Sequence, residues 1–109
     1  MESLSTLIRR GVEKRPFQIF GRRIGLLSNG DTGTDAIGAA LESAGYDLAA
    51  DPDPSHQNIY QVLEIEPMRV KSPVQSERKQ DLIDEIDDLG DVHRWSREAI
   101  ANWLEWIDL

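Results

Sequence analysis

Apolar residues recur at helical spacing in four short segments of this chain, and three of the segments are followed by a residue that ends helices. The spacing predicts helices over residues 4–14, 35–44, 77–89 and 97–108. Pro16, Gly45 and Gly90 follow the first three, since proline removes the preceding residue from helical geometry and glycine closes a last turn. With 109 residues, the sequence predicts a single domain, residues 1–109, around one core.

Two further apolar stretches predict strands. Residues 17–27 have the pattern of a hairpin with Gly21-Arg22 in its turn, because a type II′ turn needs a positive φ at its first central residue. Residues 59–65 alternate and predict a third strand, which Pro67 would confine to a sheet edge. The predicted fold class is α+β: a small antiparallel sheet of about three strands, with helices packed mainly on one face and the element order α-β-β-α-β-α-α.

The tetrapeptide Asp31-Thr32-Gly33-Thr34 is similar to the loop that supplies the catalytic aspartate of aspartic proteases. In that family the loop follows directly on one strand and continues into another, whereas here Ser28-Asn29-Gly30 precedes it and a helical pattern follows. A glycine turn before a helix can also bind phosphate, but Asp31 and Asp35 would repel that anion. We therefore predict that the tetrapeptide leads into a helix, with Thr34 as its N-cap.

Charge is strongly segregated along the chain, whose net charge is −8. Residues 1–30 have six basic against two acidic side chains, and residues 31–68 have eight acidic and no basic ones. Residues 69–80 are again basic, and residues 81–109 have nine acidic against two basic side chains. Either the opposite segments lie beside each other and compensate, or they form two faces for two kinds of partner.

Three tryptophans fall within twelve residues near the C-terminus. Trp103 lies on the apolar stripe of Ile100 and Leu104 and is predicted to be buried. Trp106 lies at the border of that stripe and is predicted to contact a partner, since tryptophan is favoured at the centres of interfaces. Trp95 precedes Ser96, the predicted N-cap of the last helix, and is a second candidate for a partner contact.

The residues that could support chemistry are few. Cysteine is absent, which removes disulfides and thiolate sites and favours a cytoplasmic location. The two histidines, His56 and His93, lack regular metal-ligand spacing, so we expect surface roles for both, with no metal and no cofactor. No apolar run is long enough to span a membrane, and the first residues lack the apolar region of a secretory signal.

These patterns predict a protein that is not an enzyme but an interaction or regulatory protein, such as an inhibitor, adaptor, immunity-type or phage or plasmid accessory protein. Its partner would be a protein with a basic surface or a second copy of the chain. The predicted partner-binding residues are Trp106, Trp95, Asp84, Glu85, Asp87 and Asp88. The alternative is a nucleic-acid-binding regulator that uses its basic segment, with Arg9, Arg10, Arg15, Arg22 and Arg23 on phosphates.

Overall fold

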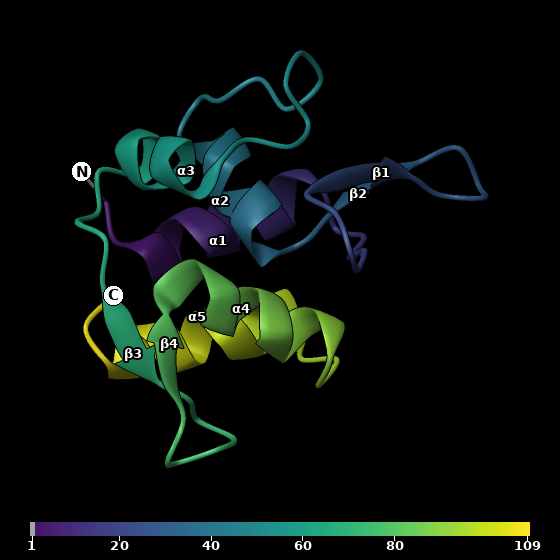
Figure 1. The fold of residues 1–109 in the computed structure, drawn as a ribbon. Coiled ribbons are helices and arrows are strands. Elements are labelled where there is room, and N and C mark those ends of the chain that lie inside the picture. The colour runs from purple at the N-terminus through teal and green to yellow at the C-terminus, as the bar shows by residue number, and fades with distance from the viewer. Residues whose placement is uncertain (1) are drawn as a thin grey trace.

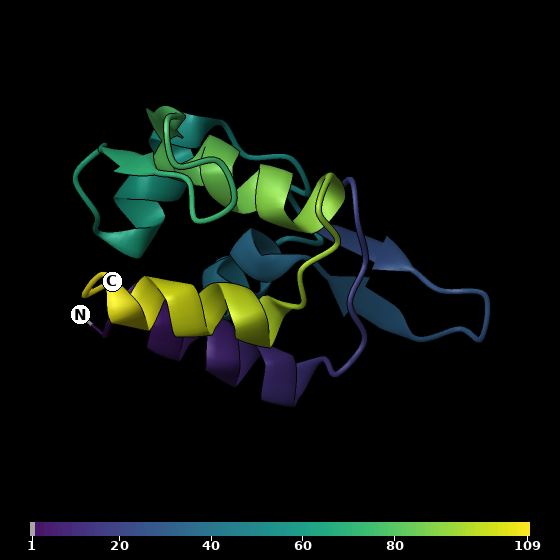
Figure 2. The same cartoon turned by 90° about the horizontal axis from the view of Figure 1, so that it is seen from below.

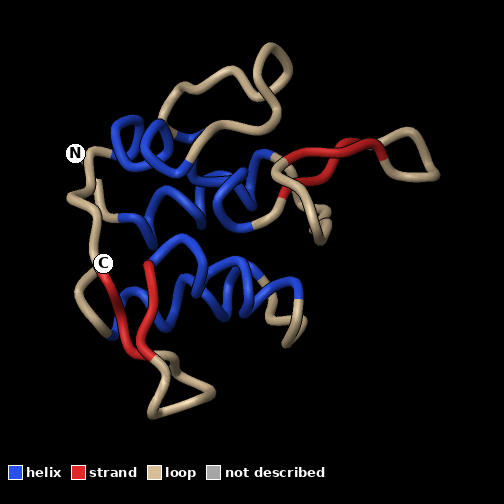
Figure 3. The backbone as a smooth tube through the Cα atoms, viewed as in Figure 1, coloured by secondary structure: helices blue, strands red, loops and turns tan. Residues whose placement is uncertain are grey.

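Five helices and two separate hairpins make up the fold in the computed structural model, which describes residues 2–109 (Figure 1). The helices form the central mass, and the two hairpins lie at different ends of it (Figure 3). The predicted α+β class is therefore confirmed, but the single three-stranded sheet and the element order α-β-β-α-β-α-α are wrong. The elements are α1 (Leu4–Lys14), β1 (Ile24–Leu26), β2 (Thr32–Thr34), α2 (Ala36–Ser43), α3 (His56–Leu63), β3 (Arg69–Lys71), β4 (Lys79–Asp81), α4 (Leu82–Asp91) and α5 (Arg97–Trp106).

Side-chain caps fix where the helices begin. Ser96 caps α5, as the sequence predicts, by accepting a hydrogen bond from the Ala99 N–H. Ser3 caps α1 by accepting from the Thr6 N–H, which decides between Ser3 and Ser5, the two caps that the sequence allows. The α2 helix begins one residue later than expected, because Asp35 and not Thr34 is its N-cap. The α4 helix begins at Leu82, after the N-cap Asp81, so residues 77–81, predicted as helix, lie outside it. It continues through Gly90, the predicted end, to Asp91.

The first hairpin pairs different residues from those that the sequence predicts. Its strands are β1 and β2, with Ile24 opposite Thr34, and the turn between them contains Gly30 at φ 90°. Gly21 also has a positive φ but lies in a bend before β1. Residues 17–19 bond to the other edge of β2, through the Ile19 N–H and the Phe17 carbonyl.

The segment predicted as the third strand is the helix α3 instead. Ser55 caps it by accepting from the Asn58 N–H, and Ile59, Tyr60 and Leu63 are its buried face. The apolar residues at positions 59 and 63 fit a helix as well as a strand, and the cap decides between the two. The β3 and β4 strands that follow form the second hairpin, with Val70 opposite Gln80.

The core lies between the helices, and its largest contact is the crossing of α1 over α2. Leu7 and Ile8 of α1 pack there with Ile37 and Leu41 of α2, all of them buried. The two backbones approach so closely that a Cβ atom at Gly11 would lie 2.3 Å from the carbonyl oxygen of Ala39. Behind this pair, α4 and α5 add further buried residues, namely Leu82, Ile83, Ile86, Leu89, Ile100, Ala101 and Leu104.

We expect Gly11→Ala to destabilise the chain by about 1–3 kcal/mol, because the α1–α2 crossing must open to admit a methyl group. Gly90→Ala is the matched control: Gly90 also lies in a helix, but nothing stands within 4 Å of its added Cβ. That variant should gain up to about 1 kcal/mol from helix propensity alone. Urea unfolding of both variants measures the difference, and equal stabilities would contradict a close-packed crossing.

Candidate functional site

The basic and acidic segments of the chain meet in the folded molecule. Arg9 pairs with Glu105 at 2.7 Å and Arg15 with Glu42 at 2.7 Å, whereas Arg10 pairs with Glu2 of its own segment. Compensation between segments, the first of the two interpretations of the charge pattern, therefore describes part of the charge in this fold. Two clusters show it most clearly, one around Arg23 and the other around Arg78.

The first cluster centres on Arg23, just before β1. Its guanidinium donates to Asp35 at 2.9 Å and to both carboxylate oxygens of Asp87 on α4, and its side chain is only 12% exposed. Although burial opposes its ionisation, the bonds to Asp87 and Asp35 raise the pKa of Arg23. One guanidinium thus pairs with two carboxylates, one at the N-cap of α2 and one on α4.

Asp35 both caps α2 and pairs with Arg23 in this cluster. Its Oδ1 accepts the Gly38 N–H at 2.7 Å as the cap of α2, while its Oδ2 accepts from Arg23. Burial raises the pKa of Asp35 to about 6, because the loss of water outweighs the favourable field of Arg23 and the Gly38 N–H. Burial raises the pKa of Asp87 as well.

The second cluster corrects the predicted acidic face of α4. Glu85 is fully buried, accepts from Gln80 at 2.8 Å and lies 3.6 Å from Arg78, so it offers no surface to a partner. Asp88 also pairs with Arg78, and Asp87 pairs with Arg23. Of the four acids predicted as one open face, Asp84 is the exposed one.

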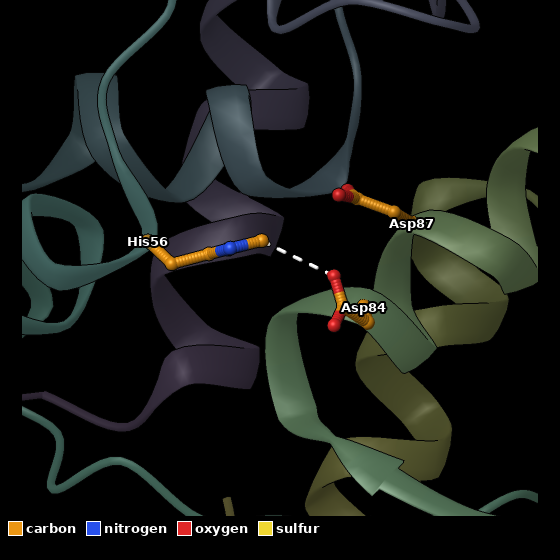
Figure 4. Close-up of side chains that lie close together, drawn as sticks. All are labelled: His56, Asp84 and Asp87. Atoms are coloured by element: carbon orange, nitrogen blue, oxygen red, sulfur yellow. Dashed lines mark ion pairs between the residues drawn. The ribbon is translucent and has the colours of Figure 1, made fainter.

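Asp84 is one of three side chains that converge between α3 and α4 (Figure 4). His56, the first residue of α3, places its Nε2 at 3.3 Å from Asp84 Oδ1. One ligand atom each from His56, Asp84 and Asp87 lies within 4.8 Å of the others. The sequence places His56 near Asp51 and Asp53, and it gives no sign that α4 supplies its neighbours, because that contact depends on how α3 packs.

The D-T-G-T segment leads into a helix, as predicted. Asp31 is exposed in the turn, and Thr32 to Thr34 form β2. Thr34 is buried, and its hydroxyl accepts from Arg97 at 3.0 Å. Arg97 itself is 3% exposed and also donates to the carbonyls of Arg15 and Pro16. Sequence reasoning missed this buried arginine, since its acceptors are two backbone carbonyls and one hydroxyl that lie 63 to 82 residues earlier in the chain.

The three tryptophans differ in exposure. Trp106 is 85% exposed, on the side of α5 away from the core. Trp103 is only partly buried, which corrects the prediction of a fully buried ring, and it packs against the edge of the core. Trp95 is partly buried too, and its carbonyl accepts from the Gln18 side chain at 2.9 Å.

Comparisons with protein-family models, with curated proteins and with solved structures found no match to this chain. Within residues 2–109, no helix is both long and apolar enough to cross a membrane.

Asp35 predicts a pH dependence of stability. Its pKa is about 6 in the folded chain against an ordinary 3.8, so folding takes up a proton between these values. The stability that this group contributes is greatest below pH 4 and falls as the pH rises through 6. Asp35→Asn retains an N-cap oxygen but cannot ionise, so its stability relative to the parent should rise by about 1–3 kcal/mol from pH 4 to pH 7.

Urea unfolding at pH 4, 5, 6 and 7 gives this difference. Asp31→Asn is the control, because Asp31 is exposed four residues earlier, and its stability should stay within about 1 kcal/mol of the parent at each pH. If the stability of Asp35→Asn relative to the parent instead fell as the pH rose, the favourable field of Arg23 would outweigh burial in setting the pKa of Asp35.

Proposed function

We propose that this chain is a non-catalytic protein-interaction domain that contacts its partner through the outward side of α5, with Trp106 as the main anchor. The observation that carries the proposal is the 85% exposure of Trp106 on a capped helix. Burial of a large apolar side chain contributes about 1.5–3 kcal/mol, and an exposed ring gains this stabilisation only when a partner covers it. Tryptophan is also among the residues that dominate measured interfaces.

The helix that presents Trp106 is firmly held. Ser96 caps its start, Arg97 is buried with three acceptors from other segments, and Ile100 and Leu104 are in the core. Near its end, the Ser5 N–H donates to the Leu109 carbonyl at 3.0 Å. A rigid platform loses little conformational entropy when it binds, so more of the contact energy remains as affinity.

The charges around Trp106 indicate the kind of partner. Glu98 is exposed on the same helix and Asp108 follows it, whereas Glu105 and Asn102, also exposed, both accept from Arg9. A groove of about 240 Å³ between α1 and α5 runs beside them, lined by Arg9, Val12, Glu13, Glu98 and Asn102. These features favour a protein partner that offers an apolar pocket for the ring and basic side chains at its rim, consistent with the partner expected from the sequence.

The alternative of nucleic-acid binding has less support. Four of its five arginines, Arg9, Arg10, Arg15 and Arg23, are paired with carboxylates of the chain itself. Within residues 2–109, Arg22 is the one of the five without an ion pair. A phosphate backbone would have to displace these internal acids before it gained the same contacts.

We therefore expect no binding of duplex or single-stranded nucleic acid near physiological salt. Fluorescence anisotropy with labelled DNA and RNA between 50 and 200 mM salt tests this, since phosphate contacts give a steep inverse dependence on salt. Micromolar, salt-sensitive binding that is lost in the Arg22→Ala variant would favour the nucleic-acid regulator instead, since Arg22 is exposed and its removal leaves the ion cluster of Arg23 intact.

For the interaction domain, we expect Trp106→Ala to change stability by under about 0.5 kcal/mol, because the ring is outside the core. The same variant should lose association with the partner. Trp103→Ala should cost about 2–3 kcal/mol, less than the roughly 3–5 of a fully buried aromatic residue. Thermal unfolding, sedimentation and affinity capture from the native host measure the three properties.

Leu26→Ala is the matched control, because Leu26 is also highly exposed, at 77%, but lies on the β1–β2 hairpin. Loss of association in Trp106→Ala alone supports the α5 surface. Equal loss in both variants indicates unspecific hydrophobic adhesion. Sedimentation of the parent distinguishes a second copy of the chain from a different partner, and a monomer with no Trp106-dependent partner would contradict the proposal.

A further inference from the structure

We propose that His56, Asp84 and Asp87 form a binding site for a divalent transition-metal ion of the zinc class, between the start of α3 and the first turns of α4. One imidazole nitrogen and two carboxylate oxygens lie within 4.8 Å of one another there (Figure 4). Zinc holds such ligands at about 2.0–2.2 Å, which places tetrahedral neighbours roughly 3.3 Å apart. The His56 Nε2–Asp84 Oδ1 distance is already 3.3 Å.

The backbone positions these donors without large movement. Asp84 and Asp87 are three residues apart on α4, so their side chains share one side of that helix. His56 faces them from α3, which is fastened to α4 by the Tyr60 hydroxyl donating to Asp81 at 2.6 Å. Asp81 is the N-cap of α4 and lies about one helical turn before Asp84. Tyr60 lies about one turn after His56 on α3, so this bond is close to both ligands.

The charge of the surroundings favours a cation. Asp35 and Asp87 share a single guanidinium, that of Arg23, and Asp84 beside them has no arginine or lysine partner within residues 2–109. With His56 neutral and the acids ionised, this group carries a net charge of −2, three acids against one base. A dication would neutralise that charge.

Arg23 does not block the site. It bonds to both oxygens of Asp87, but each carboxylate oxygen has two acceptor positions, so metal coordination and the arginine contact can coexist. The arginine would then hold Asp87 in place as an outer partner, as hydrogen bonds to metal ligands commonly do. Asp84, half exposed, has His56 as its only ion-pair partner within residues 2–109.

The donor set selects among metals. Calcium and magnesium prefer oxygen alone, whereas an imidazole with carboxylates suits zinc, cobalt and nickel. Three protein ligands leave a fourth position for water, and the 50% exposure of both His56 and Asp84 gives the ion access. Bound metal would join α3 to α4 and so fasten the long loop before α3 to the rest of the fold.

Isothermal titration of the purified chain with ZnCl₂ tests the site, in a buffer that does not chelate. We expect one zinc per chain, at least tenfold weaker binding in both His56→Ala and Asp84→Asn, and a rise in Tm with zinc that EDTA reverses. Cobalt should give the visible absorption of a low-symmetry site. Neither calcium nor magnesium at the same concentration should give a rise in Tm that is lost in His56→Ala.

His93→Ala is the matched control, since it removes the other histidine of the sequence, which is exposed after α4. Circular dichroism verifies that all variants fold, which we expect because the changed side chains are at the surface. Zinc affinity unchanged in His56→Ala, an equal loss in His93→Ala, or no binding by the parent at 1 mM zinc, a generous limit for such a site, would each overturn the proposal.

Discussion

The ion cluster around Arg23 joins three parts of the chain that the sequence separates. Arg23 precedes β1, Asp35 begins α2 and Asp87 lies on α4. Such a cluster adds little net stability, because the charges lose water when they are buried, but removal of one member costs about 3–5 kcal/mol. Its contribution is therefore specificity: α2 and α4 can approach the first hairpin only in the arrangement that satisfies both acids.

The same pairing determines what the surface can offer. Arg9, Arg15, Arg23 and Arg78 pair with acids of the acidic segments, so part of each charge block is neutralised within the fold. Many acids outside these pairs are exposed, Asp47, Asp53 and Glu66 among them, and two further features mark the surface: the exposed ring of Trp106, and Asp84 beside His56. These two features carry the proposals, the first through its exposed apolar area and the second through its converging donor atoms.

Local signals in the sequence were sufficient for some elements. Ser96 and the apolar stripes of α1 and α5 predict those helices within a few residues, because a cap and a periodic face act over one or two turns. The residues of α3 predict a strand instead, because their few apolar positions fit both periods. The sequence does not predict the pairing of β1 with β2, because Gly21 and Gly30 both suit a turn.

The candidate sites depended still more on long-range contacts. The position of Trp106 at the border of the apolar stripe indicates its exposure in part. The burial of Glu85 and Arg97 has no such signal in the sequence. The partner of Glu85 comes from the second hairpin, and those of Arg97 come from residues 15–34. His56 and Asp84 are 28 residues apart, and they meet only because α3 and α4 both pack against α2 and the Tyr60 hydroxyl donates to Asp81. A convergent site of this kind has no sequence signature, in contrast to ligands spaced along one helix or loop.

The two proposed surfaces belong to different parts of the helical assembly. Viewed from below, α5 lies beside α1, while α3 and α4 lie on the opposite side (Figure 2). A metal ion between α3 and α4 would therefore act on the stability of that half without touching the ring of Trp106. Any effect of zinc on partner binding would have to pass through the core, where Ile86 and Leu89 of α4 and Leu104 of α5 belong to one packed cluster. Because that cluster is close-packed and α5 is held at both ends, metal binding and partner binding should be close to independent in free energy.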